Sequence, residues 1–265
     1  MVHCRALFYG LVALLAAGFA LAETPGSLFT PVGDFEVVIA GNLDTGAKVY
    51  QSLEQAVVLV VSDRLPSPVV LHVKSKRLQA VPMNRLATRE MGLEMVRGEA
   101  LVDLGGFEVE GSDVVFKHGT VAGRLRPKAP LVGEHPIGEI LEHSPQYRTT
   151  AARYRPDPDI LAKLREVEGE YRVRVVFGSW CSVCKNYLPR GIRVEEDLAS
   201  EAIRFEYFGL PLEEPWEHAE VKRLKVSALP TAVIFRGDRE VGRFAGAEGW
   251  QRPEVRILQA VSAAR

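Results

Sequence analysis

The chain is poor in cysteine, carries no excess of charge of either sign, and has no long apolar run beyond its first residues. It holds three cysteines in 265 residues, too few for a small protein held together by a disulfide framework. With 33 basic and 34 acidic residues its formal net charge is −1, which argues against nucleic acid as a partner. After residue 22 the longest apolar run, residues 56–61, has the length of a strand and cannot cross a membrane.

The composition that remains is that of a globular protein. Hydrophobic residues make up 47% and charged residues 25%, which excludes a chain that is disordered throughout. The length allows one large domain or two of modest size, each able to bury its own core.

The first 22 residues have the pattern of an export signal. Arg5 precedes an uncharged apolar run, residues 6–22, which ends in Ala20-Leu21-Ala22, the small-x-small pattern of a signal peptidase site. An uncleaved membrane anchor formed by the same run is the alternative, since about 17 apolar residues lie at the short limit of a spanning helix. In both interpretations we expect the rest of the chain to be periplasmic or otherwise extracytoplasmic.

Residues 23–126 are predicted to form a β-rich domain, either a small sandwich or a barrel. Three runs are rich in β-branched residues and have strand length: 35–40, 56–61 and 69–73. Alternation in residues 107–110, followed by the turn-forming sequence Gly111-Ser112-Asp113, predicts a hairpin. No catalytic group of residues is recognisable in this domain, so its role stays open; substrate selection and homodimer formation are both compatible with it.

The composition changes after this domain. Residues 127–156 are rich in proline, which resists a continuous helix or a central strand. We expect a linker with short helical patches such as residues 137–142, which can wrap on a neighbouring domain. Residues 157–265 then show the pattern of an α/β domain. After a charged helix that begins near residue 159, the expected elements are a strand (171–177), a helix (182–198), a strand (203–208), a helix (217–224), two strands (231–236 and 240–244) and a helix (253–264).

Cys181 and Cys184 stand where the first strand of this domain passes into its helix. Cysteines three residues apart at a helix start lie on one face, close enough to form a disulfide. The helix N-terminus favours a thiolate on Cys181 and so lowers its pKa, as a nucleophile working near neutral pH requires. Cys184, one turn further on, is placed to attack a mixed disulfide on Cys181 and release the substrate.

Two other roles for the cysteine pair stay open at this point. Half of a zinc site is one, but a structural zinc needs two more ligands. After the leader the chain has no cysteine other than this pair, and its histidines there show no paired spacing: 72, 118, 135, 143 and 218. An inert structural disulfide is the other alternative, although a bridge that closes two residues constrains almost no chain.

These residues resemble the thioredoxin superfamily. Trp180-Cys181-Ser182-Val183-Cys184-Lys185 is similar to the family's Trp-Cys-x-x-Cys-Lys active site. Pro189 matches the proline that kinks the active-site helix, and Ala228-Leu229-Pro230-Thr231 resembles the family's cis-proline loop. Gly246 falls where the family keeps a glycine. The likeness covers residues 157–265, and its strength lies in the order and spacing of several motifs that are weak one by one.

The resemblance implies a thioredoxin-like fold for residues 157–265 and a set of site residues. It implies catalytic roles for Cys181 and Cys184, and a cis Pro230 beside the disulfide. Leu229 is implied to offer backbone groups to an extended substrate. Trp180 is implied to face the substrate; a plain core aromatic is the alternative for Trp180. The only redox cofactor implied is the Cys181–Cys184 disulfide itself, with no metal.

Two departures from the family limit what the resemblance implies. Thioredoxins have a buried aspartate six residues before the first cysteine, and here Val175 stands at that position. An acid that assists Cys184 is therefore absent or comes from elsewhere in the chain. The dipeptide Ser182-Val183 also lacks the histidine of strong oxidants, which favours a reductase over an oxidase. Lys185 is expected to be a solvated helix residue rather than a group that tunes the cysteines.

We therefore expect an extracytoplasmic thiol–disulfide oxidoreductase that acts on protein thiols and disulfides. It would need a membrane or periplasmic redox partner to restore its dithiol after each turnover. The alternative is a protein that binds its substrate or partner through residues 23–126, with the thioredoxin-like domain as an accessory or redox-sensing module. Replacing Cys181 by serine separates the two, since only the first function depends on that thiol.

Overall fold

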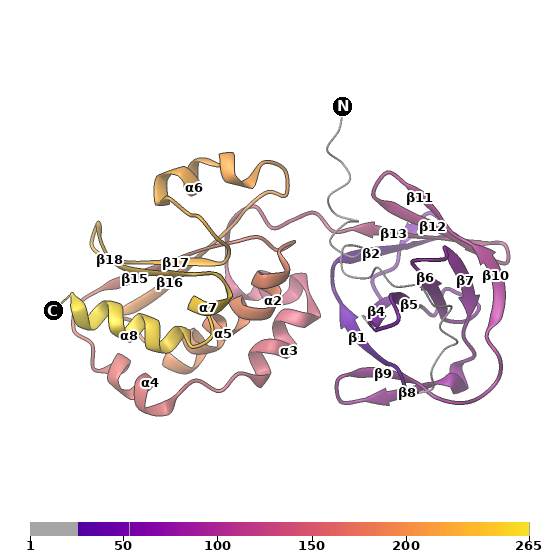
Figure 1. The fold of residues 1–265 in the computed structure, drawn as a ribbon, viewed down its shortest axis with the longest axis horizontal. Helices are drawn as coiled ribbons and strands as arrows, with labels where there is room; N and C mark the ends of the chain where they lie inside the picture. The colour runs from indigo at the N-terminus through magenta and orange to yellow at the C-terminus, as the bar shows by residue number, and fades with distance from the viewer. Residues whose placement is uncertain (1–25, 53, 265) are drawn as a thin grey trace. The chain divides into compact units, whose positions relative to one another are not determined.

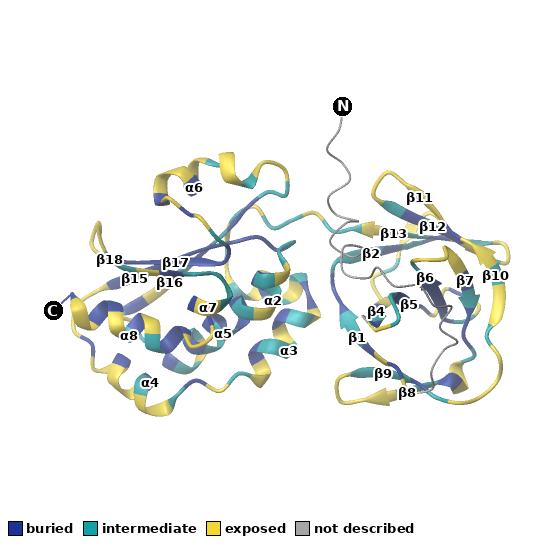
Figure 2. Ribbon diagram, in the orientation of Figure 1, coloured by how far each residue is buried: buried dark blue, intermediate teal, exposed yellow. Residues whose placement is uncertain are grey.

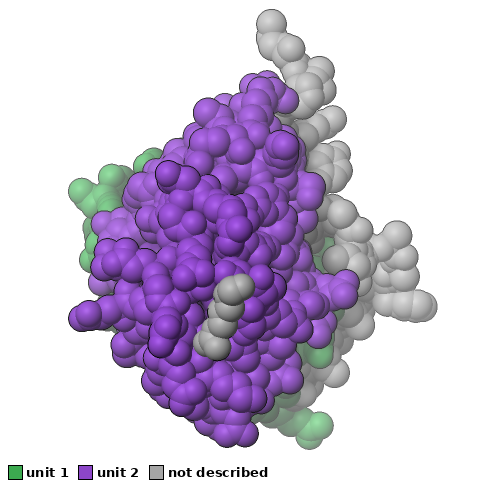
Figure 3. Space-filling view, turned by 90° about the vertical axis from the view of Figure 1, so that its left-hand side faces the viewer, with its two compact units in different colours: residues 1–128 green, residues 129–265 purple. Residues whose placement is uncertain are grey.

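A computed structural model describes residues 26–52 and 54–264 (Figure 1). The expected export signal, residues 1–22, lies outside the described residues. The chain divides into two compact units, with the boundary between Lys128 and Ala129 (Figure 3). Within the described part of the chain, no helix combines the length and the apolar character needed to cross a bilayer.

The first unit is built almost entirely of strands. Eight strands form one sheet in the order β10-β7-β6-β5-β4-β1-β9-β8, and five form a second in the order β11-β12-β13-β2-β3. All neighbours in these sheets are antiparallel, and the short 3-10 helix η1 (Met83–Arg85) precedes β8. The strand bounds are β1 Leu28–Val32, β2 Phe35–Ile39, β3 Asn42–Leu43, β4 Lys48–Ser52, β5 Val57–Val61, β6 Val69–His72, β7 Arg77–Ala80, β8 Leu86–Arg89, β9 Gly92–Met95, β10 Val102–Gly106, β11 Glu108–Glu110, β12 Asp113–His118 and β13 Val121–Pro127.

Strand β5 shows why this unit has an apolar run without alternation. Val58 and Val60 lie in a core cluster with Phe116 of the second sheet, whereas Leu59 lies in a second cluster on the other face. Because both faces of the strand are buried, every position favours an apolar side chain (Figure 2). The predicted β-rich character of this region is confirmed, as a curled eight-stranded sheet and a five-stranded sheet that share a core.

The second unit is a mixed α/β structure. Its five strands follow the order β14-β16-β15-β17-β18, with β15 and β16 parallel and the other neighbours antiparallel. The strands are β14 Gly133–His135, β15 Tyr171–Phe177, β16 Ile203–Gly209, β17 Thr231–Arg236 and β18 Arg239–Ala245. The helices are α2 Ile137–His143, α3 Pro145–Arg153, α4 Pro158–Arg165, α5 Ser182–Leu198, η2 Pro215–Glu217, α6 Ala219–Leu224, α7 Gly246–Gly249 and α8 Pro253–Ala263. The predicted order of strands and helices from residue 171 onward is confirmed.

Helices cover the two faces of this sheet unequally. Figure 1 shows α4, α5 and α8 on one side of the sheet and α6 on the other. Side chains alternate along β15, so Tyr171 donates its hydroxyl to the carbonyl of Val261 in α8, whereas Arg174 binds Glu220 in α6. The α6 side therefore receives charged residues, and the α5 side receives the main apolar core.

The proline-rich stretch 127–156 differs from the linker that we expect from its composition. It contributes β14, which pairs with β16, and α3, which packs on α5 through a 3.0 Å hydrogen bond from Gln146 Nε2 to Asn186 Oδ1. Two of its prolines stand at helix starts, where a missing N–H costs nothing: Pro145 is the first residue of α3 and Pro136 precedes α2. The helical patch expected at residues 137–142 is confirmed as α2, whereas β14 and α3 were not predicted, because proline content alone does not distinguish a helix start from a linker.

Helix α8 buries a different face from the one that periodicity predicts. The apolar periodicity of residues 253–264 predicts Val255, Leu258 and Val261 on one face. Of these three only Val261 is buried, and the helix buries Glu254 and Ile257 as well. Glu254 is drawn inward because its carboxylate accepts a 2.7 Å hydrogen bond from the hydroxyl of Tyr154. Because Tyr154 lies 100 positions away in the sequence, no local apolar pattern predicts that Glu254 is buried.

Candidate functional site

The cysteine pair lies at the carboxyl end of β15. The strand ends at Phe177, a short turn follows, and α5 begins at Ser182 with Cys181 as its N-cap. Gly178 opens this turn, and a Cβ at this position would lie 2.7 Å from the indole of Trp180. Only glycine therefore lets the tryptophan ring fold against the backbone just before the first cysteine.

Trp180 is held in place by its polar group. Its Nε1 donates a 3.1 Å hydrogen bond to the carbonyl of Leu210, the residue that directly follows β16. The ring is half-buried and packs against the core of the unit, so the side chain is neither fully internal nor free. The structure thus keeps both features considered for this residue, a core contact and an exposed part beside Cys181.

The two cysteines are free thiols in unequal surroundings. Cys184 is fully buried, at 0% exposure, and its Sγ accepts a 3.5 Å hydrogen bond from the N–H of Gly178. Cys181 is half-buried, and its Sγ accepts a 3.4 Å hydrogen bond from the N–H of Cys184. One sulfur is therefore accessible and the other is enclosed one turn along the same helix.

Their surroundings separate the two pKa values. The hydrogen bond from the Cys184 side chain is the largest effect on Cys181, and with the N–H groups of Cys184 and Val183 it outweighs partial burial and lowers the pKa of Cys181 to about 6. Burial raises the pKa of Cys184 well above its usual range, and the neighbouring Cys181 raises it further. Near neutral pH the pair therefore holds a thiolate at the accessible position and a thiol at the buried one.

Lys185 has a small part in this balance. Its charge lowers the pKa of both cysteines, but it is the weakest of the effects that act on Cys181. Val175, which stands where thioredoxins have a buried aspartate, is fully buried among apolar residues of the core.

The Leu229–Pro230 peptide bond is cis, as the resemblance implies. Thr231, the first residue of β17, pairs with Val176 near the end of β15. Because these strands are antiparallel neighbours, Pro230 and the turn that carries the cysteines lie at the same edge of the sheet. The carbonyl of Pro230 accepts 2.9 Å hydrogen bonds from the N–H of Gly246 and from Nε1 of Trp250.

Leu229 itself is 8% exposed, and within the described residues its backbone N–H and carbonyl form no hydrogen bond. The register of the sheet places the loop of Leu229 and Pro230 at the same end of the sheet as the turn that carries Trp180, Cys181 and Cys184.

Sequence reasoning missed the groups that support this edge. Ser179 Oγ accepts a 3.0 Å hydrogen bond from the N–H of Leu131, which ties the segment before β14 to the cysteine turn. Trp250, fully buried, donates its Nε1–H to the carbonyl of Pro230. Neither partner is close in sequence to the cysteines, so no local pattern points to them.

A zinc site finds no further ligands in the described residues. Among residues 26–52 and 54–264, no group of three or more Cys, His, Asp or Glu side chains is close enough together to hold a metal ion. The arrangement suits two-electron chemistry between sulfurs, in which an exposed thiolate attacks and a buried thiol resolves.

Comparisons with known proteins give distant similarities only. No family model matches the chain, and no curated protein matches it. A solved protein of unknown function from Pseudomonas aeruginosa is 15% identical, with a TM-score of 0.41 over 51% of this chain and 95% of its own. Fasciola hepatica thioredoxin is 22% identical, with a TM-score of 0.28 over 40% of this chain and 92% of its own. Schistosoma mansoni thioredoxin pre-protein is 20% identical, with a TM-score of 0.27 over 41% of this chain and 92% of its own. These identities and TM-scores show only a distant similarity between part of this chain and thioredoxins, and the similarity assigns no activity.

Proposed function

We propose that this chain is an extracytoplasmic thiol–disulfide oxidoreductase that acts on protein disulfides through Cys181 and Cys184. The observation that carries the proposal is the asymmetry of the pair: the accessible sulfur of Cys181 has a pKa of about 6, and Cys184 is buried with a raised pKa. An inert structural disulfide does not require its two cysteines to differ in exposure and pKa. A nucleophile and a resolving thiol do need it.

In the reducing direction, the thiolate of Cys181 attacks one sulfur of a substrate disulfide. The substrate S–S bond breaks, its second sulfur leaves as a thiolate that takes up a proton, and a mixed disulfide joins the substrate to Cys181. Cys184 then loses its proton and attacks Cys181 Sγ, which releases the second substrate thiol and leaves a Cys181–Cys184 disulfide. Two electrons have passed to the substrate, and an external dithiol donor must return them.

We propose the reducing direction because the dipeptide between the cysteines, Ser182-Val183, carries no histidine to stabilise a thiolate further. The donor that restores the dithiol would be a membrane or periplasmic redox protein. The extracytoplasmic location rests on the sequence pattern of residues 1–22.

The test of direction is the reduction potential of the Cys181–Cys184 couple, measured by equilibration with glutathione or dithiothreitol buffers. A value near −270 mV supports a reductase, and a value near −120 mV means that the protein is an oxidant. Trapping with Cys184→Ser, which stops the reaction at the mixed disulfide, would then identify the protein clients.

The control for the whole proposal is Cys181→Ser. This variant should lose the cellular function together with all disulfide exchange. Full retention of that function would instead favour the alternative, in which the β-rich unit binds the partner and the redox pair is accessory.

A further inference from the structure

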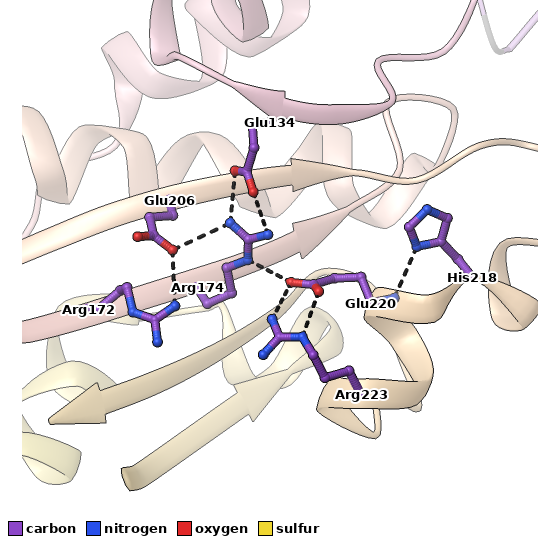
Figure 4. A network of polar contacts seen from close by, with 7 residues as sticks. All are labelled: Glu134, Arg172, Arg174, Glu206, His218, Glu220 and Arg223. Carbon is purple, nitrogen blue, oxygen red and sulfur yellow. Dashed lines mark hydrogen bonds and ion pairs between the residues drawn. The ribbon is translucent and has the colours of Figure 1, made fainter. Parts of the chain in front are cut away.

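Arg174 is a buried charge at the centre of an ion network on the α6 side of the sheet (Figure 4). Its side chain is only 8% exposed, and its Nε lies 2.8 Å from Glu220 Oε1. The Nη2 lies 2.6 Å from Glu134 Oε1, and Nη1 lies 3.4 Å from Glu206 Oε2. One guanidinium thus joins β14, β15, β16 and α6.

Two further arginines balance the charge of this network. Arg172 lies 3.3 Å from Glu206, and Arg223 lies 2.7 Å from Glu220 (Figure 4). With Arg174 they supply three positive charges against three carboxylates. Burial raises the pKa of Glu220, but its hydrogen bonds to Arg223 and Arg174 outweigh burial and lower it, so that carboxylate stays ionised.

Helix α6 has few other attachments to the sheet. It has six residues, of which only Val221 and Leu224 are buried. A helix this short is marginal by itself, so tertiary contacts must decide where it lies. Two arginines supply such contacts: Arg174 through Glu220, and Arg243 of β18 through a 2.9 Å hydrogen bond to the carbonyl of Leu224.

The position of α6 matters because the helix leads directly into the candidate site. Its C-cap, Lys225, has a left-handed backbone with φ of 52°, and four residues later comes the cis Leu229–Pro230 bond. The N–H of Val226 still bonds to the carbonyl of Val221, so the chain leaves the helix in a defined direction. A displacement of α6 would therefore also move the loop that carries Leu229.

We propose that Arg174 is a positioning residue: by holding Glu220 it fixes α6, and through α6 it fixes the Leu229 backbone at the place where a protein substrate lies when Cys181 attacks its disulfide. This inference rests on the proposed function. Arg174 has no hydrogen bond or ion pair with either cysteine in the described structure, so its effect reaches the reaction through the docking of the substrate chain and leaves the sulfur chemistry unchanged.

The test compares Arg174→Met with Arg172→Met. Arg172 lies on the same strand and in the same network, but its partners are Glu206 and the ring of Phe235, so it holds no part of α6. Each variant is assayed as the full chain on two substrates. Insulin must dock an extended segment beside its disulfide, whereas 5,5′-dithiobis(2-nitrobenzoate) is a small disulfide that needs no such docking.

Arg174→Met should lower kcat/KM for insulin by about tenfold, mainly through KM, because a misplacement of about 1 Å can cost on the order of 10²-fold. Its rate with the small disulfide should stay within about twofold of the unmodified protein. The midpoint pH of Cys181 alkylation should also stay unchanged. Arg172→Met should leave both rates unchanged.

Glu220→Gln tests the same link if Arg174→Met folds poorly, since the amide keeps the shape of the side chain and loses its charge. It should give the same selective loss on insulin at smaller size, about threefold. The inference is overturned if either folded variant keeps the insulin rate, or loses both rates to the same extent. If the unmodified protein reduces neither substrate, the proposed function itself has failed, and the two failures are thus distinguishable.

Discussion

The backbone N–H of Cys184 donates a 3.4 Å hydrogen bond to the Sγ of Cys181, so Cys184 stabilises a thiolate on Cys181. The side chain of Cys184 adds the largest single effect that lowers the pKa of Cys181. The two cysteines are therefore coupled before any disulfide forms, and a change at the buried position must alter the reactivity of the exposed one.

Cys184→Ala tests this coupling. The variant keeps the backbone N–H but loses the side-chain hydrogen bond, so the pKa of Cys181 should rise above its value of about 6. The pH dependence of iodoacetamide alkylation measures this shift. Cys184→Ser, whose hydroxyl still donates, is the matched control and should titrate closer to the unmodified protein. Equal midpoints for the alanine and serine variants would contradict the prediction.

The stability of the dithiol form should depend on pH through Cys181. Its pKa is about 6 in the folded chain, below the value of about 8.5 for an unfolded cysteine. A lowered folded-state pKa contributes stability that is present in full above the unfolded value and is lost as the pH falls through 6. Compared with Cys181→Ser, the reduced protein should therefore lose free energy of unfolding between pH 9 and pH 6. Denaturant titrations of both proteins at several pH values measure the difference, and a constant difference would refute it.

Gly191 of α5 is expected to tolerate no side chain. A Cβ there would lie 2.5 Å from the ring of Trp250, which is fully buried and cannot move aside. Gly191→Val should lower the free energy of unfolding by about 1–3 kcal/mol, as overpacking of a core does. Gly138→Val in α2 is the control, because no atom lies within 4 Å of a Cβ at that position. Urea unfolding followed by tryptophan fluorescence compares them, and equal midpoints would be the contrary result.

Tyr154→Phe should destabilise the second unit. The hydroxyl of Tyr154 donates to Glu254, whose exposure is 1%, so the variant leaves a buried carboxylate with one partner fewer. Such a loss costs about 1–3 kcal/mol. Tyr187→Phe is the control, because the Tyr187 ring also lies against the guanidinium of Arg190 and phenylalanine keeps that contact. The expected order of thermal midpoints is therefore Tyr154→Phe below Tyr187→Phe, and the reverse order would contradict it.

Much of the second unit was predictable because its signals are local. Strand β15 and helix α5 have the bounds that the sequence predicts, residues 171–177 and 182–198. In the first unit, β2, β5 and β6 were predicted from β-branched runs. Short strands such as β1, which contains Pro31, and β4, with Lys48 and Gln51, were not, because they become strands only through pairing with neighbours.

The amino-acid sequence by itself determined where the candidate site lies: two cysteines stand three residues apart, at a helix start directly after Trp180. It also determined the order of strands and helices around them, since periodicity and caps act over a few residues. Only the tertiary structure decided which distant groups hold the surrounding residues in place. Three hydrogen bonds join residues 30 to 100 positions apart: Trp180 to Leu210, Tyr154 to Glu254, and Arg174 to Glu220. Burial of such paired polar groups leaves no periodic pattern in the sequence.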